Sequence, residues 1–213
     1  MTQRTNALVR QLERYYVRFN DAFWAFFERD VQVGLPDAPV LADLGCGPGL
    51  YLRDVSGRLP QATLHGVDTG EDMLGHARSL TYAGAAPTFH DADVAGRLPF
   101  EDGSIDLLSI AAVMHTLVNP FVFLDEARRV LAPSGRLLLY DWVRVLFADY
   151  IAYREAEAGD PPEVRFPRAL ELFATHNKYT ADDWRWVFAQ ARFDVLTEAW
   201  PYPRAMALLT RPA

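Results

Sequence analysis

The stretch Val40-Leu41-Ala42-Asp43-Leu44-Gly45-Cys46-Gly47-Pro48-Gly49 decides the fold. Its first half is a short apolar run, which is typical of a buried strand, and its second half is a glycine-rich turn. Helical spacing of apolar residues follows Gly49 and continues to Leu59. A strand that ends in glycines and leads into a helix lets the backbone turn tightly and lets a ligand approach it closely. We therefore expect a nucleotide-like ligand at this turn.

Two features of the turn narrow the choice of ligand. The glycines follow the pattern G-x-G-x-G, which differs from the G-x-G-x-x-G of dinucleotide-binding turns. Asp43 stands two residues before the first glycine, and its carboxylate would repel a pyrophosphate but attract an ammonium group. Asp68 follows a second predicted strand, where a carboxylate can accept hydrogen bonds from both ribose hydroxyls. The sequence thus favours a nucleoside that carries a cation.

Strand and helix patterns alternate along the chain. Short apolar runs predict seven strands, at residues 40–44, 62–67, 88–89, 105–111, 136–140, 193–199 and 205–210. Helical periodicity predicts helices at residues 50–59, 71–80, 119–131 and 181–191. The last two strands are expected to form a hairpin through Pro201-Tyr202-Pro203. The predicted fold is α/β, with a Rossmann-like, doubly wound, mostly parallel seven-stranded sheet whose last strand is antiparallel.

Two segments depart from this alternation. Residues 5–31 carry large apolar side chains at three- and four-residue spacings, which predicts one long helix or two, and we expect an N-terminal helical cap over residues 1–38. Residues 142–178 are rich in aromatic and acidic residues. We expect them to form a lid insertion within a main domain that spans residues 39–213.

Composition limits the class of protein. The chain has 213 residues, half of them apolar, and a formal net charge of −7, which is typical of one globular domain with additions. The acidic balance argues against a nucleic-acid partner, because such binding depends on clustered Lys and Arg. With no signal peptide and no apolar run near 18 residues, we expect a cytoplasmic protein without a membrane partner. The one cysteine, Cys46, excludes a disulfide framework and a multi-cysteine metal site, and we expect no metal.

The ordered motifs resemble those of the class I S-adenosylmethionine-dependent methyltransferases of the small-molecule type (type 11/25-like domain), whose first motif is D-x-G-C-G-x-G. The resemblance covers about residues 40–140. Segments similar to later motifs of the family are DTGEDML at 68–74, LPFEDGSID at 98–106 and RRVLAPSGR at 128–136. The resemblance implies S-adenosylmethionine as the cofactor. It also implies transfer of the methyl group to a small-molecule acceptor by in-line displacement.

The same resemblance implies which residues hold the cofactor: Asp43, Gly45, Cys46, Gly47, Asp68, Thr69, Met73, Asp93, Val94 and Ala111. Met73 would lie against the adenine. Asp93, with Val94, is the expected partner of the adenine amino group, and Asp91 is the alternative, since both aspartates stand farther from Leu98 than is usual in the family. Cys46 is expected to be part of the loop and not a nucleophile.

Candidate catalytic residues lie outside the glycine turn. His115, after the fourth strand, can act as a base or acceptor contact, or it can be a packed or capping histidine. Asp141, at the end of the fifth strand, can bind substrate or cap the next segment. Tyr15 and Tyr16 can close over the cofactor or serve as core aromatics. The candidate catalytic residues are therefore His115, Tyr16 and Asp141, and further candidates for lining the pocket are Trp142 and His176.

Other functions remain open from the sequence. One is a non-catalytic regulatory module that binds S-adenosylmethionine or S-adenosylhomocysteine. Another is a nicotinamide-dependent oxidoreductase, against which Asp43 and the glycine spacing count. A nucleic-acid methyltransferase is opposed by the net charge and by Asn119-Pro120-Phe121, which lacks the second proline of an N-P-P-Y/F motif. We expect a small-molecule acceptor as the partner, and a monomer or homodimer.

Overall fold

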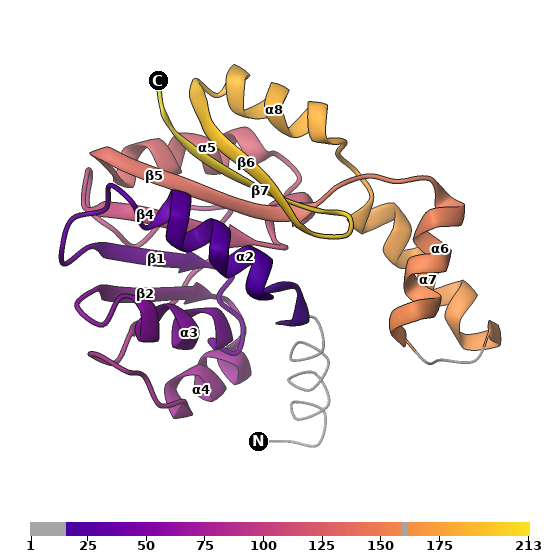
Figure 1. Cartoon of the computed structure of the whole chain (residues 1–213), viewed down its shortest axis with the longest axis horizontal. Coiled ribbons are helices and arrows are strands. Elements are labelled where there is room, and N and C mark those ends of the chain that lie inside the picture. Colours follow the sequence, from indigo (N-terminus) through magenta and orange to yellow (C-terminus); the bar gives the residue numbers. More distant parts are fainter. Residues whose placement is uncertain (1–15, 159–161) are drawn as a thin grey trace.

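The computed structural model describes residues 16–158 and 162–213. Seven strands form one sheet in the order β3-β2-β1-β4-β5-β7-β6 (Figure 1). They are β1 (Val40–Leu44), β2 (Thr63–Asp68), β3 (Thr88–Asp91), β4 (Ile105–Ala111), β5 (Leu131–Trp142), β6 (Phe193–Tyr202) and β7 (Ala205–Pro212). Strand β7 is antiparallel to both of its neighbours, β5 and β6, whereas the pairs from β3 to β5 are parallel. The predicted α/β sheet, its antiparallel last strand and the closing hairpin are confirmed, but the hairpin turns at residues 203–204, because Pro201 and Tyr202 belong to β6.

The helices largely follow the predicted ranges. They are α2 (Asp21–Phe26), α3 (Leu50–Arg58), α4 (Glu71–Ser79), α5 (Pro120–Val130), α6 (Phe147–Ala158), α7 (Pro162–His176) and α8 (Ala181–Gln190), with the shorter turns η1 (Tyr16–Arg18), η2 (Phe27–Val31) and η3 (Met114–Thr116). Asn119 caps α5 by accepting a hydrogen bond from the Phe121 amide at 3.0 Å, and Pro120 takes the first helical position. The sequence signals for this helix start are therefore confirmed.

The largest difference from the predicted elements is in β5. The strand was expected from residue 136, but it begins at Leu131, which pairs with Ile105. A register shift follows before Leu107 pairs with Arg136. Residues 132–135, which separate the predicted helix from the predicted strand, thus lie within an irregular first part of β5.

Each face of the sheet has its own apolar core, because alternate strand residues point to opposite sides. Leu137 and Leu139 pack in one cluster with residues of α5 and α8. Leu138 and Tyr140 pack in the other cluster with residues of α2, η2 and α3. Figure 1 shows α2 and α5 on opposite faces of the sheet. The sheet is therefore covered on both sides, as nearly all-apolar strands require.

Aromatic side chains bind the N-terminal segment to the sheet. The predicted helix over residues 5–31 is described from Tyr16 onward, and Asn20 interrupts it, because its side chain caps α2 by accepting from the Phe23 amide at 3.0 Å. Phe23 is fully buried and stacks on Tyr140 with ring centroids 4.7 Å apart. This packing places η1 and α2 beside the carboxyl end of β5.

Two helices, α6 and α7, make up most of the segment expected to be a lid. Figure 1 shows them beside the carboxyl ends of the central strands. Phe173 of α7 joins them, with its ring centroid 4.9 Å from that of Phe147 and 5.2 Å from that of Tyr150. No helix within the described ranges has the length and apolar character needed to span a membrane.

The aromatic contact between α2 and β5 generates a stability prediction. Phe23→Ala removes a fully buried ring, so we expect the free energy of unfolding to fall by about 3–5 kcal/mol. Val33→Ala is the control, because Val33 is 65% exposed, and it should change that free energy by less than about 0.5 kcal/mol. Urea unfolding followed by circular dichroism measures both. A loss under about 1 kcal/mol for Phe23→Ala would show that α2 is not part of the folded core.

Candidate functional site

All three glycines of the turn after β1 have left-handed backbone angles, and two of them show why no side chain fits. Gly45 has φ of +71° and Gly49 has φ of +80°. A Cβ atom at Gly45 would lie 2.4 Å from Cγ2 of Val113, and one at Gly49 would lie 2.7 Å from Cβ of Ala77. Backbone conformation and lack of space both exclude a side chain at these positions. The turn therefore stays tight and brings bare backbone to the wall of the cavity described below.

Asp68 is held rigidly at the carboxyl end of β2. Its Oδ2 accepts a hydrogen bond from the Gly47 amide at 2.8 Å, and its Oδ1 accepts one from the Gly70 amide at 2.8 Å. A carboxylate oxygen can accept more than one hydrogen bond, so both oxygens keep capacity for a ligand. The two amides thus fix a carboxylate that can bind a pair of hydroxyl groups.

Asp43, at the end of the central strand β1, is a buried acid. It is 3% exposed, and the Ser109 hydroxyl donates a hydrogen bond to its Oδ1 at 3.0 Å. Burial raises the pKa of Asp43 to about 7; the charge of Asp68 acts in the same direction, whereas the Ser109 hydrogen bond and the charge of Arg18 lower it. A cation placed beside this carboxyl group would favour its ionised form.

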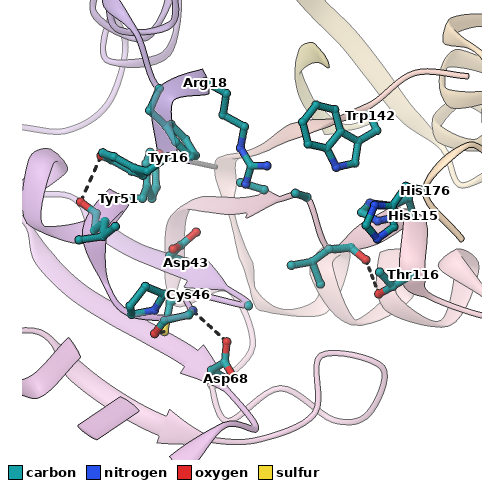
Figure 2. A pocket seen from close by; sticks show the side chains of 18 of the residues that line it. Tyr16, Arg18, Asp43, Cys46, Tyr51, Asp68, His115, Thr116, Trp142 and His176 are labelled. Carbon is teal, nitrogen blue, oxygen red and sulfur yellow. Dashed lines mark hydrogen bonds between the residues drawn. The ribbon is translucent and has the colours of Figure 1, made fainter. Parts of the chain in front are cut away.

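Both carboxylates line one cavity of about 470 Å³. That volume falls within the range of about 300–1,000 Å³ that is typical of small-molecule sites. Figure 2 shows Asp43, Cys46 and Asp68 on one side of this cavity and Trp142, His115 and His176 on the other. The cavity therefore joins a glycine-turn end, built by the turn after β1 and by β2, to a lid end, built by η3, β5 and α7.

The structure brings most of the expected cofactor residues to this cavity. Those in its lining are Asp43, Gly45, Cys46, Gly47, Asp68, Met73 and Ala111. Thr69, Asp93 and Val94 lie outside the described lining. Thr69 is exposed, Val94 belongs to the core on the α5 side, and Asp93 is exposed with its Oδ1 accepting from the Ala95 amide at 2.8 Å. The alternative, Asp91, is also exposed and outside the lining.

Cys46 lies in the loop as expected and is buried. Burial raises the pKa of its thiol, and the nearby charges of Asp43 and Asp68 raise it further. A thiol in such surroundings stays protonated and is a poor nucleophile. In the described part of the chain, no cluster of three or more His, Cys, Asp or Glu side chains could hold a metal ion.

A buried histidine–aspartate pair lies at the lid end. Nδ1 of His115 is 2.6 Å from Oδ1 of Asp141, and Oδ2 of Asp141 accepts from the His115 amide at 3.0 Å. The Trp142 amide donates to Oδ1 at 2.7 Å, so Asp141 is the acceptor of all three contacts. Nδ1 of His115 therefore donates to the carboxylate, and Nε2 is the ring nitrogen left for a ligand. Nε2 is buried and finds no hydrogen-bond partner in the described structure.

Tyr16 lines the cavity, but its hydroxyl is engaged elsewhere. It donates to Oδ2 of Asp54 at 2.7 Å, with a second contact of 3.2 Å to the Leu50 carbonyl. Burial and the hydrogen bond to Asp54 both raise the pKa of Tyr16. Tyr16 therefore forms part of the wall of the cavity, and its hydroxyl proton is already donated to Asp54. Tyr15 lies outside the described residues.

Sequence reasoning identified Trp142 and His176 as lining residues, and both are in the lining. It missed several others, among them Arg18, Tyr51, Tyr150 and Arg204. Arg18 is the one with a usable signal, because it lies within the aromatic N-terminal segment expected to cover the site. The other three lie in no recognisable motif, and only the packing of distant segments brings them together.

The chain is similar in sequence to known methyltransferases. Residues 42–139 match the family model described as a methyltransferase domain. A trans-aconitate 2-methyltransferase of Azoarcus sp. (strain BH72) is 36% identical over 108 residues, which cover 51% of this chain and 41% of that protein. A demethylmenaquinone methyltransferase of Thermus thermophilus is 35% identical over 116 residues, which cover 54% of this chain and 52% of that protein. The chain thus spans about half of the length of these relatives or less.

Solved structures share the fold over nearly the whole chain. The plantazolicin methyltransferase BpumL, solved in complex with SAH, aligns with a TM-score of 0.72 and 15% sequence identity, covering 99% of this chain and 90% of that one. At this level of identity the likeness establishes the fold alone, and the sequence similarity to methyltransferases comes from the family model and the relatives named above. Residues 42–139 thus match a methyltransferase domain, and the fold around them is that of solved methyltransferases.

Proposed function

We propose that this protein transfers the methyl group of S-adenosylmethionine to a small-molecule acceptor. One observation carries the proposal: a buried carboxylate, Asp43, and a fixed carboxylate, Asp68, flank a glycine turn that opens into a single cavity. Asp43 would hold the ammonium group and Asp68 the ribose hydroxyls. The residues present therefore fit this cofactor in both charge and hydrogen-bonding capacity.

The acceptor is proposed to be a small molecule for two reasons. The cavity has the volume of a small-molecule site, and aromatic side chains such as Phe19 and Trp142 line it. The relatives named above act, according to their names, on trans-aconitate and on demethylmenaquinone, which are small molecules. A cytoplasmic location, a monomeric or homodimeric state and the lack of nucleic-acid and membrane partners stay predictions from the sequence.

Bound S-adenosylmethionine supplies an electrophilic methyl group on a sulfonium. The chain contributes placement, because holding the acceptor atom in line with that group removes much of the entropic barrier. The His115–Asp141 pair contributes a base: Asp141 fixes the ring through Nδ1, and Nε2 is left to accept a proton from an acceptor hydroxyl. Tyr16, through its contact with Asp54, closes the wall on the glycine-turn side.

The two alternative functions are less well supported by this arrangement. A regulatory module that only binds S-adenosylmethionine would have no use for an oriented histidine at the acceptor end of the cavity. A nicotinamide-dependent oxidoreductase would need a pyrophosphate at the glycine turn, where Asp43 would repel it. The family matches likewise point to methyl transfer.

The assignment of Asp68 generates a binding prediction. Asp68→Ala removes both acceptors for the ribose hydroxyls, and we expect the affinity for S-adenosylhomocysteine to fall about 100-fold, since hydrogen bonds to a charged group contribute about 1.5–3 kcal/mol. Isothermal titration calorimetry measures the change. Glu71→Ala, at the exposed start of α4, is the matched control and should bind like the native protein. A change under about threefold for Asp68→Ala, in a protein that still folds, would contradict the assignment.

The His115–Asp141 pair generates a kinetic prediction. His115→Gln removes the free nitrogen, and we expect kcat to fall by about 10²–10⁴ with acceptors that must lose a proton, while S-adenosylhomocysteine binds unchanged. Transfer of a trideuterated methyl group to a panel of phenols and hydroxy acids, followed by mass spectrometry, measures kcat. The control His65→Gln lies outside the cavity lining and should leave transfer unaltered. Equal turnover in the His115→Gln protein would rule out a base at this position.

A further inference from the structure

An arginine occupies a strained position at the lid end of the cavity. Arg204 lies in the turn between β6 and β7 with φ of +64°. Its carbonyl accepts a hydrogen bond from the Val143 amide at 2.7 Å, which ties the turn to the segment after β5. A left-handed backbone costs free energy for any residue with a Cβ atom, and glycine is the residue that fits such a turn without strain. Strained backbone of this kind is common at functional sites, so the side chain of Arg204 is a candidate for a role in the cavity.

Arg204 belongs to the wall of the cavity, and its guanidinium lies among aromatic rings. Its Cζ lies 4.5 Å from the ring centroid of Tyr150, on α6, and 5.7 Å from that of Trp142, on β5. Tyr150 is 2% exposed and Trp142 is 8% exposed, so the cation lies against two buried rings. Both aromatic residues also line the cavity, so an apolar part of its wall adjoins a planar group that can form two parallel hydrogen bonds.

Charge is divided along the cavity. Among the lining residues that the structure describes, the carboxylates are Asp43 and Asp68, both at the glycine-turn end. A second arginine, Arg18, lowers the pKa of Asp43 and therefore acts at the glycine-turn end. The Cζ atom of Arg18 also lies 5.3 Å from the ring centroid of Trp142. Arg204 and the His115–Asp141 pair belong to the lid end. The two ends are thus suited to ligand groups of opposite charge.

We propose that Arg204 binds a carboxylate of the methyl acceptor, and that the acceptor is a small organic acid with a flat, conjugated skeleton. The carboxylate would pair with the guanidinium, and the skeleton would lie against Trp142 and Tyr150. This inference rests on the proposed function, because it takes the ligand at the lid end to be the methyl acceptor. It specifies the class of substrate and one residue that selects it.

The fold offers matched variants for a test. Arg204→Gly removes the guanidinium and also relieves the left-handed strain, so the variant should unfold at a temperature no lower than that of the native protein. Arg204→Lys keeps the positive charge without the planar fork. Arg192→Gly is the control, because Arg192 also has a left-handed backbone, with φ of +57°, but is exposed and outside the cavity lining.

The experiment titrates the protein, loaded with S-adenosylhomocysteine, with two pairs of probes: benzoate against benzamide and cinnamate against cinnamamide. We expect at least one acid to bind about tenfold or more tightly than its amide, because the guanidinium pairs with the carboxylate. Arg204→Gly should abolish that preference, Arg204→Lys should keep part of it, and Arg192→Gly should leave it intact. Amides that bind as well as acids, acids that bind the Arg204→Gly protein undiminished, or no binding of either acid would overturn the proposal.

Two further titrations separate this inference from the proposed function. S-adenosylhomocysteine is first titrated alone into the native and the Arg204→Gly proteins, and it should bind both equally. If it binds neither, the proposed function fails. The acid and amide probes are also titrated without S-adenosylhomocysteine. The effect of Arg204 on the preference for the acid is then measured independently of cofactor binding.

Discussion

A carboxyl group buried at the carboxyl end of the central strand is the constraint on which the site depends. Asp43 is 3% exposed, and the interactions that favour its ionised form are the Ser109 hydrogen bond and the charge of Arg18. Burying an ionised carboxylate without a close cation costs several kcal/mol, which is why its pKa is raised to about 7. A cationic ligand in the adjoining cavity removes this cost. The burial of Asp43 therefore both costs free energy on folding and favours a cationic ligand.

The other polar groups of the cavity are also held in place by hydrogen bonds within the protein. The glycine turn brings backbone to the cavity wall near Asp43, and two backbone amides hold Asp68 as the second acceptor. At the lid end, Asp141 accepts three hydrogen bonds from the residues around it and so fixes which nitrogen of His115 is free. The two carboxylates proposed to bind the cofactor thus lie across the cavity from the histidine and the arginine proposed to bind the acceptor.

The sequence predicts those parts of the molecule that depend on local patterns. Strand β1, its turn and α3 can be recognised within consecutive residues, and Asp68 follows from its place after the next strand. Asp141 was only one of several candidates, because its contact with His115 requires the pairing of β4 with β5. Arg204 carries no local signal at all, since its turn meets Tyr150 only when β7 inserts between β5 and β6. Asp93 and Val94 rested on family spacing, and the structure leaves them outside the described lining.

The measurement that tests this account most directly is the number of protons released when S-adenosylmethionine binds at pH 6. Calorimetric titrations in buffers of different ionisation enthalpy give that number. Burial raises the pKa of Asp43 to about 7, so at pH 6 the free protein holds this group mostly protonated, and an ammonium bound beside it must expel the proton. We predict release of close to one proton by the native protein and none by Asp43→Asn. Binding without proton release, or the same release by both proteins, would contradict the central role of Asp43.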